Sequence, residues 1–571
     1  MNRSDRLAVV ALGVILVIQA TALAWQAWAV GVTVDEPSHL LSATLYWRGA
    51  DNLLPRDMPP AIKIVGGWVP NMLGAPIPFD SPSFERRNEW ESALAMMSRM
   101  KPERVQRVFF WSRLPLIVFP LMASLVLFLW IREVLGPWPA AAAALLFAFG
   151  PTSMAHGSLF KNDQAAAFGY LLFWWRAWKY WLAPAPRNLA WLTAGVAAGV
   201  MAKLSMLLLV AAAPVVIAAV AWRQRRPRLL AHAAALLLAV YGAALATSWF
   251  EIRRLHRDEV QAVRADPRNP AWLRAGASLF RVIPAPKLYW DGVVSLAASQ
   301  ADGNPVYLLG KREPRGSPYY FLVASAVKFT AGLQLLTLTG AMVAAWMLRR
   351  GRIPPSLAVF LIVPPLLYVG LASTASMQLG VRLILPAVPF AAFVAAFVFA
   401  PGGWRWRPYL SAFGGLLLAL VAAQSARYYP HGMSFFNVWA GGSENGLRYL
   451  ADSNIDWGQD LPSLAEWVRA NHVDHIRLFY FGNDTPWRFF SDETIERLAP
   501  PWGPDLVKSN PYRPEPGYYA VSATLLPGHF FAAAYRDYFK AFREATPIAR
   551  AGHSIFIYRF GEASHASAKP R

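Results

Sequence analysis

The hydrophobic positions of this chain form long continuous runs, separated by short polar segments rich in Lys and Arg. Runs of about 20 apolar residues recur, and a helix of that length spans the hydrocarbon core of a bilayer. The clearest runs cover residues 7–30, 109–131, 140–156, 164–181, 229–250, 319–348, 354–374, 383–400 and 409–426. Because the runs do not alternate with polar residues, they predict membrane-spanning helices and disfavour a membrane β-barrel.

A further run, residues 189–222, is ambiguous, because about 34 residues are too many for one ordinary helix and few for two. If it is a helical pair that turns near Lys203, the basic segments 223–228, 349–352 and 405–407 all lie on the cytoplasmic side. The first run follows a basic N-terminal segment and shows no clear cleavage site, so it is predicted to be an uncleaved helix. We therefore predict roughly eleven transmembrane helices, with the N-terminus inside and the C-terminus outside.

This topology divides the chain into a transmembrane module, residues 1–426, and an extracytoplasmic C-terminal domain, residues 427–571. Two loops, residues 31–106 and 251–318, lie on the same side of the membrane as that domain. The expected fold is an all-α polytopic membrane protein with a small extracytoplasmic α/β domain.

The C-terminal domain is predicted to combine strands with a helix. Residues 473–482 and 553–560 have the pattern of strands, and Ser463 with Glu466 has the spacing of a capping box. Residues 452–460 are dense in turn formers and hydrogen-bond acceptors. This composition is typical of an ordered turn before the helix; the alternative is a segment that lines an acceptor cleft or binds a cation.

Composition excludes several classes of protein. Of 571 residues, 56% are hydrophobic and only 16% are charged, which excludes a soluble globular protein and a disordered chain. The chain has no Cys, so it is not a disulfide scaffold. The net charge of +21 is concentrated in short loops and reflects membrane topology, so nucleic acid is not an expected partner.

Ionisable residues within predicted spans are costly in a membrane and are therefore candidates for function. Six candidates in or beside the spans fall in the outer part of the predicted membrane or at its outer rim: Arg113, Lys161, Asp163, Lys203, Lys328 and Arg382. The cytoplasmic halves of the spans carry few isolated charges. Each one alone is explained by snorkelling to the headgroups or by an ion pair. Their shared placement predicts a cationic pocket at the outer leaflet, suited to an anionic lipid headgroup.

Acidic residues follow the first helix directly. Asp35 and Glu36 have the pattern of a helix start, with Asp35 as the N-cap. A carboxylate at the membrane rim is also a candidate general base, and Asp163 is a second acid on the same face. His39 lies one helical turn from Asp35 and His156 lies near Asp163, so the two histidines are candidate ligands of a divalent metal ion.

Pro59 and Pro60 introduce the next predicted element. Residues 62–73 have the pattern of an interfacial helix, with Trp68 as its anchor. Lys63 then lies at the depth of lipid phosphates, as a phosphate ligand or as a plain interfacial lysine.

These residues occur in a characteristic order: an Asp-Glu pair after the first helix, a Pro-Pro-x-x-Lys segment, and a second Asp that opens the fourth span. Further matching segments are 195–203 (GVAAGVMAK), 307–310 (YLLG), 316–328 (GSPYYFLVASAVK), 382–390 (RLILPAVPF) and 441–460 (GGSENGLRYLADSNIDWGQD). In order and placement they resemble the GT-C glycosyltransferases. The resemblance is to the protein O-mannosyltransferase and aminoarabinose-transferase superfamily, the glycosyltransferase family 39 type, in a bacterial branch. It extends over nearly the whole chain.

The resemblance implies a membrane enzyme of the bacterial inner membrane, with its C-terminal domain in the periplasm. Such an enzyme moves a hexose such as mannose, or a pentose, from a polyprenyl-phosphate carrier to a protein, lipid or surface glycan by inverting displacement. Carried over to this sequence, Asp35 is the catalytic base with Glu36 beside it, Asp163 is the second acid, and Lys63 contacts the carrier phosphate. The other candidate ligands of that phosphate are Arg113, Lys203, Lys328 and Arg382. Met58 departs from the pattern, since many members have His or Tyr there, and leaves acceptor or metal contacts open.

Two other classes of function are open to a chain of this kind. A lipid-linked-sugar transporter or flippase predicts charges on both sides of the midplane or repeated halves, and the sequence has neither. A non-catalytic membrane assembly protein gives no reason for acids and bases to gather at one rim.

Overall fold

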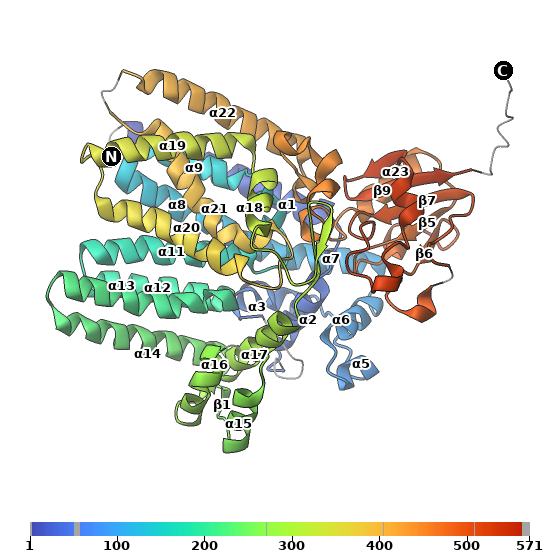
Figure 1. Ribbon diagram of the computed structural model, residues 1–571, viewed down its shortest axis with the longest axis horizontal. Coiled ribbons are helices and arrows are strands. Elements are labelled where there is room, and N and C mark those ends of the chain that lie inside the picture. Colours follow the sequence, from blue (N-terminus) through green and yellow to red (C-terminus); the bar gives the residue numbers. More distant parts are fainter. Residues whose placement is uncertain (1–2, 51–57, 270, 403–404, 508, 562–571) are drawn as a thin grey trace.

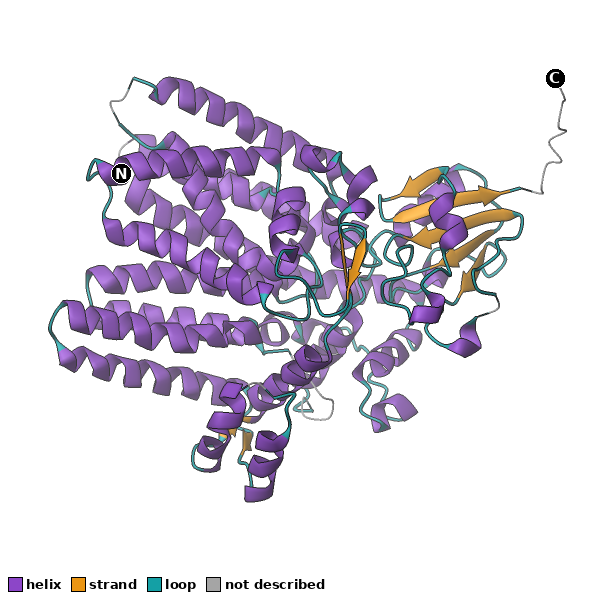
Figure 2. Ribbon diagram, in the orientation of Figure 1, coloured by secondary structure: helices purple, strands orange, loops and turns teal. Residues whose placement is uncertain are grey.

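A computed structural model of the chain describes residues 3–50, 58–269, 271–402, 405–507 and 509–561. Roughly parallel helices form one large bundle, and a small β-sheet domain lies at one end of it (Figure 1). Figure 2 shows that the strands of the large sheet are confined to this end. The two parts are those expected from the hydrophobic pattern.

The bundle is built from long apolar helices. They are α1 (Arg3–Ala29), α7 (Pro102–Arg113) continuing into α8 (Val118–Leu135), α9 (Pro137–Ala148), α10 (Pro151–Gly157), α11 (Asp163–Leu182), α12 (Pro186–Ala202), α13 (Leu208–Arg223), α14 (Leu230–Thr247), α19 (Ala331–Arg349), α20 (Pro355–Ser373), α21 (Val388–Ala396) and α22 (Arg407–Tyr428). Within the described residues, eight helices are long and apolar enough to cross a membrane, or nine if the bent pair α9–α10 is one span. The predicted eleven would also count α11 and α12, which lie beside these helices (Figure 1).

The ambiguous run is a helical pair, as predicted: Lys203 separates α12 from the 3₁₀ turn Leu204–Leu207 that begins the next helix. The prediction of one continuous span over residues 319–348 is wrong. The chain forms a short helix, α18 (Tyr320–Lys328), and then breaks before α19. The Thr330 side chain accepts a hydrogen bond from the Leu333 N–H and starts the new helix, so Lys328 lies at a helix end rather than deep within a span.

The two long loops, residues 31–106 and 251–318, are mostly short helices. The first holds α2 (Glu36–Tyr46), α3 (Ala61–Gly66), α4 (Trp68–Met72), α5 (Pro82–Glu85) and α6 (Glu89–Ser98), so the predicted interfacial helix is two short helices. The second holds β1 (Ile252–Arg253), α15 (Arg257–Ala265), α16 (Ala271–Gly276), β2 (Ala285–Pro286), α17 (Lys287–Asp302), β3 (Val306–Leu308) and β4 (Lys311–Glu313).

The C-terminal domain contains a five-stranded mixed sheet of order β6-β5-β7-β9-β8. The strands are β5 (Ile476–Phe479), β6 (Ile495–Leu498), β7 (Gly517–Ser522), β8 (Ala549–Ala551) and β9 (Ile555–Phe560), with helices α23 (Leu461–Ala470) and α24 (Lys540–Glu544). The two predicted strands are confirmed as β5 and β9. The capping box is wrong, because α23 begins two residues before Ser463, after Asp460.

Alternation along the strands gives this sheet two buried faces. Ile476 and Leu478 of β5 pack with α23 on one face. Phe479, the next residue along, packs on the other face with aromatic residues of β7 and α24. That second core continues into Tyr320 and Phe321 of α18, so the domain and the bundle are packed together through a shared apolar core.

The predicted topology can be tested by labelling, since a chain without Cys accepts single cysteines cleanly. We expect Glu85→Cys and Glu493→Cys to react with a membrane-impermeant maleimide in intact cells. Arg350→Cys, at the turn after α19, should react only after permeabilisation, because Lys and Arg clusters remain cytoplasmic. Labelling of all three from one side would contradict the topology.

Candidate active site

The predicted charged residues converge at the end of the bundle that carries the sheet domain. Asp35 immediately precedes α2, and Lys161 lies in the turn between α10 and α11. Asp163 is the first residue of α11, and Lys203 lies at the break between α12 and α13. Arg382 is the second residue of the 3₁₀ segment Val381–Ala387 that leads into α21. Helix ends far apart in the sequence thus supply every member of the cluster.

These side chains form a continuous row of ion pairs. Asp35 Oδ2 contacts Lys161 Nζ and lies 3.7 Å from a terminal nitrogen of Arg382. The other terminal nitrogen of Arg382 is 3.5 Å from Asp163 Oδ2, and Lys203 Nζ donates to Asp163 Oδ1 at 2.6 Å. Three cations therefore face two carboxylates, which leaves the row with an excess of positive charge that an anion would neutralise.

The two carboxylates differ in access. The Asp163 side chain is 0% exposed, whereas that of Asp35 is 22% exposed. Burial raises the pKa of Asp35, but the positive charges of Lys161 and Arg382 outweigh it and hold the pKa below its usual value. Asp35 is therefore an ionised carboxylate that is partly accessible to solvent. Asp163 is fully buried and neutralises part of the charge of Lys203 and Arg382.

Asp35 occupies the predicted N-cap position, but its side chain makes no capping hydrogen bond. Glu36 Oε2 accepts hydrogen bonds from the backbone N–H and the hydroxyl of Thr33, which lies before the helix. The carboxylate of Asp35, free of a capping bond, faces Lys161 and Arg382.

Glu36 and Arg113 form a buried ion pair that connects the first loop to the bundle. Arg113 donates to both oxygens of Glu36 and to the backbone carbonyls of Ala27 and Gly31. Glu36 also accepts from the Phe160 N–H at 2.7 Å, and both side chains are at most 1% exposed. Their expected roles in catalysis and phosphate binding are not favoured by this geometry, because their polar atoms are already used within the protein.

Lys328 is likewise bonded within the protein, and its contact with the carrier phosphate stays a prediction. Its ammonium donates to the carbonyls of Met433 and Asn454 at 2.7 and 2.5 Å and lies 4.4 Å from the centroid of the Phe436 ring. It thus connects α18 to the start of the C-terminal domain. Lys63 is buried on α3, with its ammonium 6.0 Å from the Tyr46 ring centroid, and its contact with the carrier phosphate stays a prediction.

The histidines do not gather ligands for a metal ion. His39 Nδ1 lies 3.2 Å from the Phe160 carbonyl, and His156 is buried edge-on to Trp457 at 6.4 Å between ring centroids. Among the described residues, no group of three or more His, Cys, Asp or Glu side chains could hold a metal. The metal ion stays an untested expectation, and no step below depends on one.

Two site residues come from the C-terminal segment 452–460 and were not singled out from the sequence. Trp457 is 2% exposed, and its ring lies 4.3 Å from Lys161 Nζ and 4.2 Å from the Arg382 guanidinium. Asp452 interacts electrostatically with Arg382, Asp35 and Lys161, and burial raises its pKa to about 7. The density of acceptors in this segment was the only signal for them.

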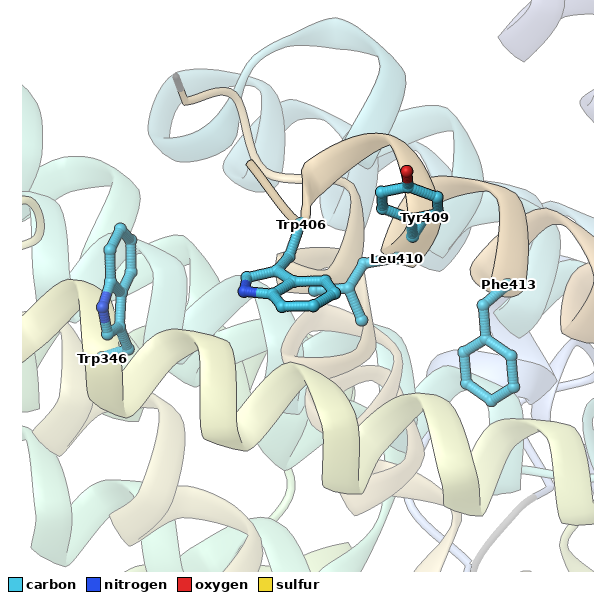
Figure 3. A pocket seen from close by; sticks show the side chains of 5 residues that line it. All are labelled: Trp346, Trp406, Tyr409, Leu410 and Phe413. Atoms are coloured by element: carbon cyan, nitrogen blue, oxygen red, sulfur yellow. The ribbon is translucent and has the colours of Figure 1, made fainter. Parts of the chain in front are cut away.

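An apolar pocket elsewhere in the protein has no such chemistry. It lies between α19 and α22 and is lined by Trp346, Trp406, Tyr409, Leu410 and Phe413 (Figure 3). Trp346 is at the end of α19 next to Arg349, away from the end that faces Lys328. An aromatic pocket beside Arg residues at helix ends is typical of a membrane–water interface.

Comparison with known proteins gives a partial family match. Residues 106–249, about a quarter of the chain, match the family model described as dolichyl-phosphate-mannose-protein mannosyltransferase. This segment resembles that family. It includes Lys161, Asp163 and Lys203 of the ion-pair row, and the match supports the resemblance to GT-C glycosyltransferases seen in the motifs. No curated protein matches the chain.

Solved structures of low sequence identity resemble the chain along most of its length. ArnT from Cupriavidus metallidurans bound to undecaprenyl phosphate is 12% identical, with 96% of this chain and 97% of that chain covered and a TM-score of 0.42. An Archaeoglobus fulgidus oligosaccharyltransferase tethered with an acceptor peptide is 13% identical, with 94% and 72% covered and a TM-score of 0.39. The arabinofuranosyltransferase AftD from Mycobacteria is 13% identical, with 99% and 40% covered and a TM-score of 0.32.

The buried pair predicts a large effect on stability. Arg113→Gln leaves the Glu36 carboxylate buried without its cation, which typically costs about 3–5 kcal/mol. We expect a clear fall in the melting temperature of the detergent-extracted protein. Arg86→Gln is a matched control, because Arg86 pairs with Glu91 at an exposed site where such a pair contributes less than about 1 kcal/mol. Equal melting temperatures for the two variants would contradict the structural role of Arg113.

Asp452 predicts a pH dependence of substrate binding. Since the pKa of Asp452 is raised to about 7, the group is neutral below that pH and becomes an anion above it. The new charge faces Arg382, Lys161 and Asp35 and opposes binding of an anionic substrate. For an anionic substrate whose own charge is constant in this range, we expect KM to rise through about pH 7.

Asp452→Asn should remove this rise in KM, and Asp474→Asn, at an exposed position of the same domain, should retain it. A rise that persists in Asp452→Asn would assign the titration to another group.

Proposed function

We propose that this protein is an integral membrane glycosyltransferase that uses a polyprenyl-phosphate sugar as donor and works at the extracytoplasmic face. The observation that supports it most strongly is the arrangement of Asp35: a reachable carboxylate beside Lys161 and Arg382, in a row with excess positive charge. A lipid-linked phosphate is the anion that such a row would meet at the end of a membrane bundle.

The proposed reaction is a direct displacement at the anomeric carbon of the sugar. Asp35 takes the proton from the acceptor hydroxyl or amine, and the acceptor atom forms its bond to the anomeric carbon. The bond between that carbon and the phosphate oxygen breaks on the opposite face, and the electron pair leaves with the polyprenyl phosphate. The configuration inverts, as in single-displacement glycosidases.

Arg382, Lys203 and Lys161 are the residues proposed to stabilise the leaving phosphate. Their side chains lie within one row, and Lys203 is 18% exposed. A preorganised cation aimed at developing charge in a dry site is often the largest single contribution to catalysis. Asp163 holds Lys203 and Arg382 in place when no phosphate is bound.

The same cations regulate the basicity of Asp35. In the structure they hold its pKa low, which makes it a weak base. A phosphate that shares Lys161 and Arg382 withdraws part of this stabilisation, so the pKa of Asp35 rises once the donor is bound. The base would thus become effective only when the sugar is in place.

Support for the finer assignments comes from the comparisons. The matched family is described by a dolichyl-phosphate-mannose donor, so we propose a single sugar on a polyprenyl monophosphate, with mannose as the first sugar to assay and a pentose as the second. The acceptor is a protein, a lipid or a surface glycan. A bacterial inner membrane with a periplasmic C-terminal domain is the proposed location. A transporter would need charge along its whole path, whereas these charges gather at one end of the bundle.

The decisive variant is Asp35→Asn, which keeps the size of the side chain and removes the base. We expect transfer from a synthetic polyprenyl-phosphate sugar to fall by about 10²–10⁴-fold, since that is the usual contribution of a positioned base. Donor binding should be retained, whereas the melting temperature should fall, because buried Lys161 loses its carboxylate partner. Mass spectrometry of lipid extracts from the mutant strain should show the sugar donor accumulating.

Asp80→Asn is the matched control, because Asp80 lies in the same loop but is an exposed partner of Arg99. It should retain full transfer. Near-normal turnover in Asp35→Asn would remove Asp35 from the mechanism. Movement of labelled donor across vesicles without release of polyprenyl phosphate would favour a flippase instead.

A further inference from the structure

The backbone that leads to Asp35 is held by the C-terminal domain. Gly31 N–H donates to the Gln459 carbonyl at 2.8 Å, and Val34 N–H donates to the Trp457 carbonyl at 3.0 Å. Val32 N–H donates to the Asp484 carboxylate at 2.9 Å. A segment of the first loop therefore runs along residues that lie more than four hundred positions away in the chain.

Gly31 makes this close approach possible. A Cβ at this position would lie 3.1 Å from the Asp484 carboxylate and 3.2 Å from the Gln459 carbonyl. Those distances are shorter than ordinary van der Waals contacts, so a Cβ here would require its neighbours to shift by a few tenths of an ångström.

Trp457 adds a contact with the cations themselves. Its ring lies close to both Lys161 and Arg382, the two cations that contact Asp35. The face of an indole ring attracts cations, and this attraction is strongest where water is excluded. Two like charges that would repel one another are thereby held beside one carboxylate.

The turn that carries Trp457 is fixed by the sheet domain. The Tyr480 hydroxyl, just after β5, donates to the Gly458 carbonyl at 2.5 Å. The Thr524 N–H, just after β7, donates to the Asp456 carboxylate at 3.2 Å. Trp457 N–H donates to the Gln459 side chain at 2.7 Å, which closes the turn. The position of the ring is thus set by the ends of two strands.

We propose that Trp457 is a positioning residue by which the C-terminal domain holds Lys161 and Arg382 on Asp35 and keeps the segment 31–34 docked. The domain is then a required part of the catalytic centre rather than an appendage. The effect on catalysis rests on the proposed function, whereas the docking of the segment does not.

The docking is tested without any assay of activity. Val34→Cys places one thiol in the Cys-free chain at a position that lines a pocket between the first loop and the domain. Its rate of reaction with a polar maleimide should rise about tenfold when Trp457→Leu removes the aromatic face. Trp457→Phe, which retains that face, should change the rate by less than about twofold. Trp439→Leu, at an exposed position of the same domain, is the control and should leave the rate unchanged.

The effect on catalysis is read from the pH profile. The charged and titratable groups that face Asp35 are Lys161, Arg382, His39 and Asp452. Without Trp457 the two cations are no longer held on Asp35, so the acidic limb of kcat/KM should move up by about one pH unit and kcat should fall about tenfold. Trp457→Phe should restore most of both. The shift of the acidic limb is the result that a simple loss of packing would not predict.

Unchanged maleimide reactivity in Trp457→Leu would overturn the docking. Faster reactivity with an unchanged acidic limb would overturn the catalytic part of the proposal. If the unmodified protein transfers no sugar while Trp457→Leu still speeds the labelling of the thiol introduced by Val34→Cys, the docking stands and the proposed function fails.

Discussion

Asp35 remains an anion at the membrane rim because Lys161 and Arg382 lie against it. Removing a charge from water is expensive, and only a close partner offsets the cost. Asp163 and Lys203 continue this row of ion pairs, so that each buried charge in it has a neighbour of opposite sign. Cations nevertheless exceed carboxylates in the row. The ion pairs that stabilise these buried charges therefore also leave the row able to bind one more anion.

Residues of the C-terminal domain also stabilise the buried cations. Lys328 donates to the carbonyls of Met433 and Asn454, and Arg382 donates through its Nε to the Ser453 hydroxyl at 3.0 Å. Asn454 in turn accepts from the Val381 N–H at 2.9 Å, next to Arg382. Backbone carbonyls and hydroxyls of one domain thus satisfy the cations of the other, which explains why a buried lysine such as Lys328 needs no acidic partner.

The hydrophobic pattern predicted the bundle and the strands of the C-terminal domain, because each follows from local periodicity. The helical pair at Lys203 was predicted from the side on which the basic segments lie. It also placed Asp35, Asp163 and Arg382 at one rim, since topology alone determines the side of the membrane. The pattern could not predict which charged residues pair with one another. Glu36 and Arg113 are far apart in the sequence, and nothing in their spacing indicates that they form a buried ion pair. Trp457 was missed for the same reason: a buried Trp in a polar turn indicates packing, and only the tertiary contacts place its ring beside two cations.

Because the two carboxylates differ in exposure, the two sides of the site are not equivalent. Asp163 is sealed beneath Arg382 and Lys203, whereas Asp35 is open beside the segment that docks on the C-terminal domain. An inverting displacement needs the proton acceptor and the leaving group on opposite sides of the sugar. If Asp35 is the base, as proposed, the open side would receive the acceptor, and the cations paired with Asp163 would contact the departing phosphate. Exchanging these roles would require a carboxylate with no access to solvent to take a proton from an incoming molecule.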